Sequence, residues 1–512
     1  MTALNSVGTS GSRRSLLLAA VAGLVVIGSV ARFLTGSPLW LDEALSVNIA
    51  SLPLGDIEGA LRRDGHPPLY YWLLHGWMEV FGDGDRAARA LSGVISLATL
   101  PLIWAIGRRV EGARAARFAL LVAALSPYAI RYASEARMYA LVMLLVAAGY
   151  LLYRRVVEGP RVLDTVLLAV TVGALLWTHY WSAYLLAVVG VALLVHWWRA
   201  PEERRATGAV IVAFGAGLVS FLPWLPAFLD QAAHTGTPWG RPARPTQVLS
   251  ETIQDLGGGP FPEGHLYGIV AVVLVLLAAL VHAASDTTGR VELAGSLHPR
   301  LRRELTAVAG TLLLGTAIGY LTNGSFASRY AAVVVPLILV AIGVGMSLLP
   351  KGWIRWGLVL GLVTTGLVGT YEVVSTDRSQ AEELAAEIAA EAGPADVVVV
   401  CPDQLGPSLD RALSGSVVES SIVPYPTAGD PRFVDWRDYE ERNDAADPAA
   451  FAAGVLDQVG EGGAVWMVWN GTYRTFEDHC EAIISHLGAT LAPEVVLPAG
   501  DQFERADLFV FR

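Results

Sequence analysis

Two adjacent carboxylates, Asp42 and Glu43, directly follow the first long apolar segment of the chain. An acid at the mouth of a membrane helix is costly to place there, and such acids commonly serve a function. Neighbouring side chains on a helix diverge by about 100°, so we expect one acid to face a substrate and the other to cap, to bind a cation or to anchor a base. The alternative is a solvated pair that complements the dipole of a helix starting near Leu45.

A second candidate is His66, which precedes the proline pair Pro67-Pro68. Proline in the first turn of a helix sacrifices no hydrogen bond, so the pair predicts a helix start just after the histidine. The stretch from Leu52 to Gly84 is too polar to span a membrane, but five apolar residues in it recur at helical spacing, which predicts an amphipathic helix on the outer membrane surface; they are Leu69, Trp72, Leu73, Trp77 and Val80. His66 would then face lipid headgroups or a substrate pocket, with Tyr70 beside it. The alternative is an exposed histidine in a turn.

A third cluster, in the short connection around residues 126–139, contains Arg131, Glu135 and Arg137. Arg131 and Glu135 are spaced to share one helix face, so an internal ion pair is one interpretation. The other is a phosphate ligand, because a guanidinium group binds phosphate oxygens through two parallel hydrogen bonds.

Further candidates occupy later connections. His179 and Tyr180 lie in a tight turn, and Arg329 opens a late apolar segment at the same expected membrane level. Anchoring at the membrane interface accounts for Tyr180 but not for Arg329. The connection from Asp230 to His265 is long enough to form a lid over a substrate.

The composition places these residues in a membrane protein. Of the 512 residues, 54% are hydrophobic and only 16% are charged, which is too apolar for an ordinary soluble protein. Apolar stretches recur, and we expect a polytopic α-helical fold with eleven transmembrane helices. The predicted spans lie near Ser15 to Phe33, Arg89 to Ile106, Arg117 to Ile130, Met138 to Tyr153, Val162 to Trp177, Trp181 to Trp198, Thr207 to Phe228, Tyr267 to Ala284, Leu305 to Leu321, Ala331 to Leu349 and Gly352 to Tyr371.

The arginines orient these spans through the positive-inside rule. Segments assigned to the inside hold 18 of the 28 basic residues that precede residue 372, and segments assigned to the outside hold 13 of the 21 acids. We therefore predict a multi-pass protein of the cell (plasma) membrane. Asp42, His66 and everything after Tyr371 would lie outside.

The charge balance changes near residue 372. Residues 372–512 carry 26 acids against 8 arginines, so we predict two domains: a transmembrane domain over 1–371 and an acidic extracytoplasmic domain over 372–512. Alternating helix and strand patterns in the second domain predict a small α/β fold. Its two cysteines, Cys401 and Cys480, could form a disulfide or remain as two buried thiols. It has no glycine-rich phosphate loop and no metal-ligand motif.

Four motifs in order resemble one protein family. They are "WLDEALSVNIA" from residue 40, "DGHPPLYYWLLHGW" from residue 64, "SPYAIRYASEARMYAL" from residue 126 and "SRYAAVVVPL" from residue 328. Together they resemble the C-type (GT-C) glycosyltransferases, and within them the bacterial relatives of the protein O-mannosyltransferases and of the lipid A aminoarabinose transferases. The resemblance covers about Met1 to Tyr371.

The resemblance implies a polyprenyl-phosphate sugar as donor, an acceptor on the outer face and inversion at the anomeric carbon. Asp42 matches the family's general base, and Glu43 its usual neighbour. His66 stands where the aminoarabinose transferases have an acid implicated in metal binding, so whether a divalent metal takes part is left open. The resemblance assigns contacts to the donor phosphate to Arg131, Arg137 and Arg329. The catalytic residues would thus be Asp42 and Glu43, in a substrate pocket formed by His66, Tyr70, Glu135, His179 and Tyr180.

These observations predict an integral membrane glycosyltransferase of the cell envelope, either a hexosyl- or a pentosyltransferase and similar to the mannosyltransferases. Its expected partners are the lipid-linked donor, a glycan, lipid or protein acceptor, and membrane lipids, with no nucleic acid. The alternative is a transporter or flippase of polyprenyl-linked sugars. A transporter would bind its substrate near the middle of the membrane, whereas the predicted spans contain few charged residues there. A third interpretation is a membrane scaffold that presents the acidic domain.

Overall fold

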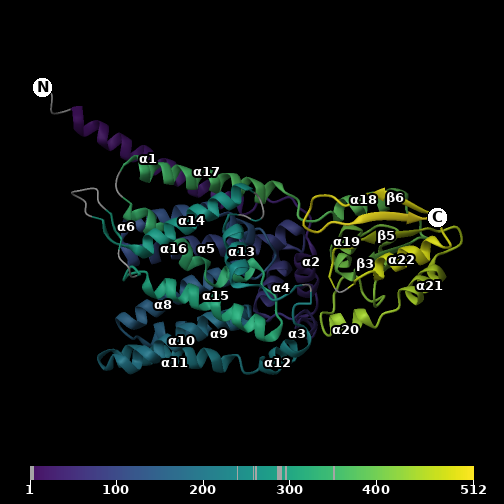
Figure 1. Cartoon of the computed structure of the whole chain (residues 1–512), viewed down its shortest axis with the longest axis horizontal. Coiled ribbons are helices and arrows are strands. Elements are labelled where there is room, and N and C mark those ends of the chain that lie inside the picture. Colours follow the sequence, from purple (N-terminus) through teal and green to yellow (C-terminus); the bar gives the residue numbers. More distant parts are fainter. Residues whose placement is uncertain are drawn as a thin grey trace.

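The computed structural model describes residues 5–512 apart from 239, 258, 260–261, 285–290, 294–296, 350–351 and 475. It consists of a bundle of long helices and a smaller α/β domain at one end of that bundle (Figure 1). The fold is mostly helical, as the composition predicted. A five-stranded sheet lies in the C-terminal part, and a two-stranded antiparallel sheet of β1 (Val281–Ala284) and β2 (Val291–Leu293) follows helix α14 (Pro262–Leu280).

The long helices of the bundle run roughly parallel to one another (Figure 1). They are α1 (Asn5–Ala31), α5 (Asp85–Glu111), α6 (Ala113–Leu125), α7 (Pro127–Ala133), α8 (Tyr139–Glu158), α9 (Val162–Thr178), α10 (Trp181–Arg199), α11 (Arg204–Ser220), α14 (Pro262–Leu280), α15 (Arg302–Thr322), α16 (Val335–Leu348) and α17 (Trp353–Ser375).

Among the described residues, five helices are long and apolar enough to cross a membrane, and up to seven if each of two bent helix pairs counts as one span. Four shorter apolar helices also occur. Each predicted span overlaps one of these helices or bent pairs. The span predicted from Tyr267 to Ala284 is too long, because the helix ends at Leu280 and the next four residues form strand β1. The total of eleven stays a prediction.

Apolar side chains cover much of the outside of the bundle. Val162 is 83% exposed, Leu321 81% and Leu360 67%, on three different helices or their ends. Such exposure of branched apolar side chains is unfavourable in water and is expected where lipid chains surround the helices.

One of the bent pairs is stabilised by a buried arginine. Helices α6 and α7 meet at 53° around Ser126. Pro127 has no N–H to offer the carbonyl of Ala123, which would otherwise be its helical partner. Arg32, fully buried beyond the end of α1, donates instead to the carbonyls of Ala123 (2.8 Å) and Ala124 (2.9 Å) and to the hydroxyl of Ser96 (3.0 Å).

Short helices cover the end of the bundle that faces the α/β domain (Figure 1). They are α2 (Leu41–Ala50), α3 (Leu54–Asp64), α4 (Leu69–Phe81), α12 (Leu225–His234) and α13 (Pro245–Leu256). The helix predicted from the spacing of Leu69 to Val80 is α4, and α3 before it was not predicted. Gly65, at φ +90°, ends α3, because this left-handed conformation strains residues that carry a Cβ.

The C-terminal domain is built on a five-stranded sheet in the order β4-β3-β5-β7-β6. Strands β4, β3 and β5 run parallel to one another. Strand β7 is antiparallel to both of its neighbours, β5 and β6. The strands are β3 (Val397–Cys401), β4 (Ile422–Pro424), β5 (Val465–Trp469), β6 (Pro493–Leu497) and β7 (Asp507–Phe511), and the helices are α18 (Ala381–Glu391), α19 (Gly406–Ala412), α20 (Tyr439–Asp444), α21 (Pro448–Gln458) and α22 (His479–Gly488).

Helices cover both faces of this sheet. Alternate residues of β3 point to opposite sides, so Val397 and Val399 pack with α21 and α22, while Val398 and Val400 pack with α18 and α19. A strand buried on both faces requires a continuous apolar run, and the sequence of β3 is Val-Val-Val-Val-Cys. The predicted α/β class is thus observed in this domain. Strand β4, only three residues long, was not predicted.

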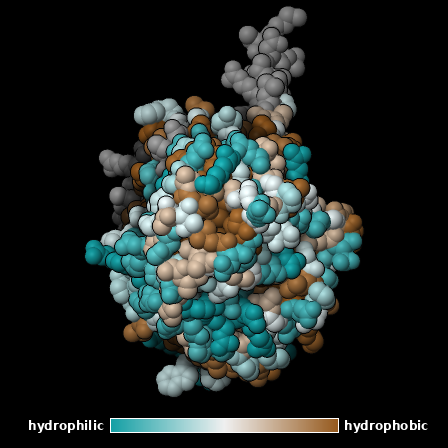
Figure 2. Space-filling view, turned by 90° about the vertical axis from the view of Figure 1, so that its right-hand side faces the viewer, coloured by the Kyte–Doolittle hydropathy of each residue, from teal (hydrophilic) through white to brown (hydrophobic). Residues whose placement is uncertain are grey.

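Cys401 and Cys480 form a disulfide that joins the end of β3 to α22. This selects one of the two interpretations that the sequence left open. Figure 2 views the α/β domain from the side away from the bundle, and this face is mostly hydrophilic with scattered hydrophobic areas. It is the kind of surface that an acidic domain presents to water.

Candidate active site

The carboxylate of Asp42 lies between two arginines. Asp42 is in the first turn of α2, and its Oδ2 is 3.5 Å from Nη2 of Arg137 and 3.6 Å from Nη2 of Arg329. This oxygen is buried and accepts no hydrogen bond from any residue that the structure describes. The two guanidinium groups come from distant parts of the chain, one before α8 and one in the 3₁₀ helix Ser328–Val333. The structure therefore brings together three residues that the motifs predicted.

Arg137 is the central donor of this cluster and is almost fully buried. Its Nη1 donates to the carbonyl of Asp42 (3.2 Å) and to the hydroxyl of Ser46 (3.1 Å), so it is fixed to two positions of α2. Its Nη2 donates to Nε2 of His66 at 3.2 Å. Its Nε, which is also buried, has no hydrogen-bond partner within the described part of the chain.

His66 is held in one orientation by two partners. A guanidinium group only donates, so Nε2 of His66 must accept the bond from Arg137. The ring hydrogen is thereby assigned to Nδ1, which donates to Oδ2 of Asp64 at 2.7 Å. The hydroxyl of Tyr71 donates to the same oxygen at 3.1 Å. His66 thus lies beside the candidate site, as predicted, with both ring nitrogens engaged.

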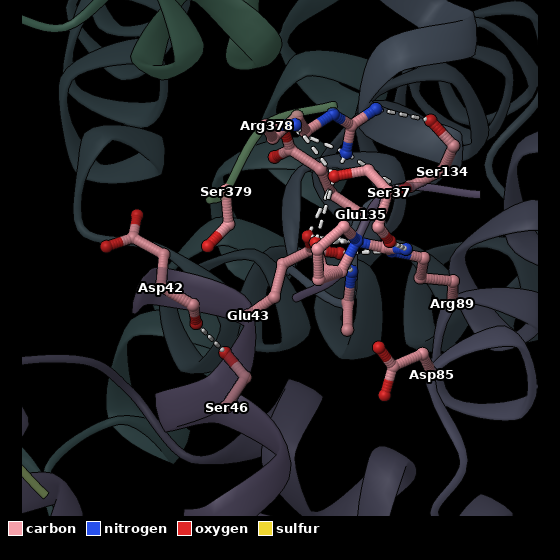
Figure 3. Close-up of polar contacts among 12 residues, drawn as sticks. Ser37, Asp42, Glu43, Ser46, Asp85, Arg89, Ser134, Glu135, Arg378 and Ser379 are labelled. Atoms are coloured by element: carbon pink, nitrogen blue, oxygen red, sulfur yellow. Dashed lines mark hydrogen bonds and ion pairs between the residues drawn. The ribbon is translucent and has the colours of Figure 1, made fainter. Parts of the chain in front are cut away.

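Glu43 points away from Asp42, as expected for adjacent helical residues (Figure 3). Its two carboxylate oxygens accept from Nε (2.7 Å) and Nη2 (2.6 Å) of Arg89, and it also accepts from the backbone N–H of Ala136 at 2.9 Å. Burial alone would raise the pKa of Glu43, but Arg89 and Arg378 outweigh it and lower the pKa. A fully buried carboxylate in a bidentate pair is an anchor, so Glu43 fixes α2 against α5.

Glu135 and Arg131 belong to a neighbouring ion-pair network. Nε of Arg131 is 3.4 Å from Oε1 of Glu135, and its Nη1 is 3.4 Å from Asp255 on α13. Arg378, in the connection to the C-terminal domain, lies 3.5 Å from the same Glu135 oxygen (Figure 3). Burial raises the pKa of Glu135. The internal ion pair foreseen as an alternative for Arg131 is therefore present, and its contact with a donor phosphate stays a prediction.

Aromatic rings form one side of the cluster. His179 is buried, with its ring centroid 5.7 Å from that of Tyr139 and 5.4 Å from that of Tyr330. The guanidinium carbon of Arg329 lies 5.7 Å from the ring centre of Trp40. The buried hydroxyl of Tyr139 finds no hydrogen-bond partner among the described residues. His179 thus belongs to the surroundings of Asp42.

Two predicted pocket residues bond elsewhere. The hydroxyl of Tyr70 is 2.9 Å from that of Ser92 and is fully buried. Tyr180 donates to Gln231 of α12 and accepts from Nε1 of Trp224 at 3.0 Å. These contacts give both tyrosines packing roles in the helical framework, and a contact with substrate stays a prediction for each.

Comparisons with known proteins agree with the predicted resemblance. Residues 65–226, less than half of the chain, match the family described as dolichyl-phosphate-mannose-protein mannosyltransferase. The structure is similar to the apo oligosaccharyltransferase of Archaeoglobus fulgidus, with 10% sequence identity and a TM-score of 0.50 over 87% of this chain and 69% of that chain. The match over residues 65–226 and the shared fold make the chain similar to the GT-C glycosyltransferases.

Other solved structures are also similar to this chain. Apo ArnT from Cupriavidus metallidurans has 15% identity and a TM-score of 0.49 over 98% of both chains. The arabinofuranosyltransferase AftD from mycobacteria has 13% identity and a TM-score of 0.47 over 96% of this chain and 41% of that chain. No curated protein matches the sequence. At such identities the likeness concerns the fold, so the function must be argued from the site.

The groups around Asp42 do not fit a divalent cation. Two guanidinium groups lie 3.5 and 3.6 Å from its carboxylate, and they would repel a metal ion. Asp64 and His66 already bond to each other. Across the described ranges, no group of three His, Cys, Asp or Glu side chains is placed to hold a metal. The mechanism proposed below therefore contains no metal step.

Several residues of the cluster were not predicted from the sequence. Asp64, Tyr71 and Arg89 were missed, although the first two stand inside the quoted motif around His66. Arg378 was missed because it lies beyond the predicted transmembrane domain and reaches Ser134 across 244 positions. No local pattern signals such a contact.

A separate groove lies along the predicted lid. It has a volume of about 940 Å³ and is lined by Arg241, Pro242, Arg244, Thr246, Gln247, Ser250 and Tyr320. Asp42 is not among these residues, so this groove is distinct from the cluster described above. The predicted lid residue Trp239 lies outside the described residues.

Proposed function

We propose that this protein transfers a sugar from a polyprenyl-phosphate-linked donor to an acceptor hydroxyl on the outer face of the membrane, with inversion and with Asp42 as general base. One observation supports this most. Three buried polar atoms, Asp42 Oδ2, Arg137 Nε and Tyr139 Oη, lie in one cluster without hydrogen-bond partners among the described residues. Buried polar groups are nearly always paired, so such a cluster is suited to a polar ligand.

Two arginines supply what the leaving group needs. When the bond between the anomeric carbon and the phosphate oxygen breaks, the lipid phosphate gains negative charge. Arg137 is buried and the side chain of Arg329 is 20% exposed. Guanidinium groups fixed in a site that excludes most water stabilise such developing charge strongly. The matched family is named after a dolichyl-phosphate sugar, which supports a donor of this chemical class.

Asp42 supplies the base. An acceptor hydroxyl is a weak nucleophile, so its proton must leave as its oxygen bonds to the anomeric carbon. Asp42 Oδ2 accepts that proton, while the electrons of the broken bond pass to the lipid phosphate. In the structure the Asp42 carboxylate still contacts both arginines at 3.5 and 3.6 Å. Phosphate binding would exchange one of these contacts for a phosphate contact and free the carboxylate for the acceptor.

The other residues of the cluster have supporting roles in this proposal. Glu43 anchors α2 through Arg89, so it is a positioning residue. His66 orients Arg137 through Nε2. Helix α2, which carries Asp42, lies at the end of the bundle that faces the disulfide-bonded α/β domain (Figure 1). Disulfides persist in oxidising compartments, which supports an extracytoplasmic position for that domain and for the site.

The test is sugar transfer from radiolabelled polyprenyl-phosphate sugars to membrane acceptors, using purified protein in membranes from cells that lack it. Asp42→Asn is compared with Asp56→Asn, which alters an exposed acid on neighbouring α3. We expect the first variant to lose transfer by about 10²–10⁴-fold, the usual contribution of a general base, and the second to keep it.

Two results would contradict the proposal. Undiminished transfer by Asp42→Asn would exclude Asp42 as the base. Translocation of the labelled lipid across vesicle membranes, with no transfer from any of several donors, would favour the flippase alternative.

A further inference from the structure

A carboxylate of the C-terminal domain caps the helix that carries Asp42. Glu504, between β6 and β7, is 3% exposed, and its Oε2 accepts a hydrogen bond from the backbone N–H of Leu41. Its Oε1 accepts from the hydroxyl of Ser379 at 2.7 Å. Leu41 is the first residue of α2, and Asp42 is the next.

This hydrogen bond satisfies a backbone N–H at the start of α2. The first N–H groups of a helix have no partner within the helix, and a buried helix start requires one from elsewhere. Trp40, which stands at the capping position, provides no side-chain cap. A carboxylate suits the position because the amino end of a helix carries partial positive charge. Glu504 supplies this cap from 463 residues away along the chain.

Aromatic packing reinforces the same contact. Phe503 meets the ring of Trp40 edge-on, with centroids 5.3 Å apart. The guanidinium group of Arg329 lies 5.7 Å from the centre of the same Trp40 ring. Trp40, together with Leu41, belongs to the buried cluster that forms one side of the core of the C-terminal domain. The start of α2 is therefore packed into this domain, next to one of the two arginines that contact Asp42.

The linker to the C-terminal domain bonds both to Glu504 and to the segment that precedes α2. The backbone of Glu504 pairs with this linker, donating to the carbonyl of Arg378 (2.8 Å) and accepting from the N–H of Gln380 (2.9 Å). The N–H of Arg378 donates to the hydroxyl of Ser37 at 2.7 Å, and its guanidinium group donates to Ser134 at 3.0 and 2.8 Å. Figure 3 shows Arg378 close to Ser37 and Ser134.

We propose that Glu504 is a positioning residue for sugar transfer: the C-terminal domain fixes the first turn of α2, and thereby Asp42, through the Glu504–Leu41 cap. This inference rests on the proposed function of Asp42. It gives the α/β domain a part in the reaction of the membrane domain, beyond any contact with the acceptor. Reactive groups displaced by about 1 Å can lose about 10²-fold in rate, so loss of the cap would reduce kcat.

The test compares Glu504→Ala and Glu504→Gln in the full-length protein. We expect Glu504→Ala to lower kcat about 10- to 100-fold with the donor KM changed less than about threefold. Glu504→Gln keeps one oxygen acceptor for Leu41 and should recover most of this loss. The matched control is Asp396→Asn, because Asp396 also accepts from a backbone N–H (Ala464, 2.8 Å) and from Trp466, at the opposite end of the sheet.

Hydrogen exchange of the peptide around residues 38–47 gives a second readout that needs no activity. In Glu504→Ala, exchange at the start of α2 should rise, whereas in Asp396→Asn it should not. Unchanged exchange in Glu504→Ala would overturn the proposed cap. An equal loss of kcat in Asp396→Asn at matched thermal stability would overturn the positioning role. If the wild-type protein transfers no sugar, the proposed function fails, while the exchange measurement still decides the cap.

Discussion

The residues that contact Asp42 and Glu43 give these two adjacent acids different roles. The sequence showed two adjacent acids after an apolar segment, and helical geometry predicted that they would diverge. The structure gives each a different partner: Asp42 contacts Arg137 and Arg329, whereas Glu43 binds Arg89. The family resemblance grouped Asp42 with Arg131, Arg137 and Arg329, and the structure brings only the last two to Asp42, while Arg131 pairs with Glu135 and Asp255. The motifs could not predict Arg89, because its partner lies 46 positions away.

Replacing Arg329 tests the phosphate site. We expect Arg329→Gln to lower kcat/KM for the lipid-linked donor by about 10²–10³-fold, since one fixed positive charge at the leaving group is lost. Arg329→Lys should recover part of the activity, because it restores the charge without the planar guanidinium group. The control is Arg86→Gln, an exposed arginine at the start of α5. Equal effects of Arg329→Gln and Arg86→Gln would contradict the assignment.

Replacing Glu43 tests whether the Glu43–Arg89 pair fixes α2 against α5. Glu43→Gln leaves the buried Arg89 guanidinium without its carboxylate, and an unpaired buried charge commonly costs about 3–5 kcal/mol. We expect a lower temperature of thermal unfolding in detergent, measured against Asp56→Asn. An unfolding temperature equal to that of the control would show that the Glu43–Arg89 pair does not hold α2.

At the scale of the element, broken helices need partners for their free carbonyls. Arg32→Leu removes three hydrogen bonds to Ser96, Ala123 and Ala124 at the junction of α6 and α7. We expect a destabilisation of about 2–5 kcal/mol, since hydrogen bonds to charged groups contribute about 1.5–3 kcal/mol each and the losses overlap. Thermal unfolding measures it, with Arg117→Leu, an exposed arginine on α6, as the control. A shift no larger than that of the control would contradict this role.

Helices and strands of the chain were largely predictable. Apolar runs marked the positions of the bundle helices, and four valines in a row marked β3, because burial on both faces demands such runs. Breaks were harder to predict. The bend at Ser126 lay inside one predicted span, because it depends on local backbone conformation that hydrophobic periodicity does not report.

At the scale of the molecule, the sequence predicted two domains but not their contact. The charge change near residue 372 marked the boundary region, and α17 in fact continues to Ser375. The contacts of Glu504 with Leu41 and of Arg378 with Ser37 join positions more than 300 residues apart. No periodicity encodes such pairs, so the role of the acidic domain could not be predicted from its composition.

The disulfide offers a test of this domain. It links positions 79 residues apart, and closing a loop of this length stabilises a fold by about 2–4 kcal/mol. We expect Cys401→Ser with Cys480→Ser to lower the unfolding temperature of the domain. Mass spectrometry after alkylation without reductant should find no free thiol in the wild-type protein. Two alkylated cysteines in protein isolated under oxidising conditions would contradict the disulfide.

The most direct test of the central claim is the affinity of Asp42→Asn for a non-transferred polyprenyl phosphate, measured by titration in nanodiscs. The claim is that Arg137 and Arg329 bind the phosphate while Asp42 competes for them and acts as base. Removing the Asp42 charge should therefore leave the affinity for polyprenyl phosphate unchanged or tighten it by up to about tenfold, which corresponds to about 1.4 kcal/mol. Sugar transfer should be lost. Weakened binding of the lipid phosphate by this variant, or retained transfer, would contradict the account.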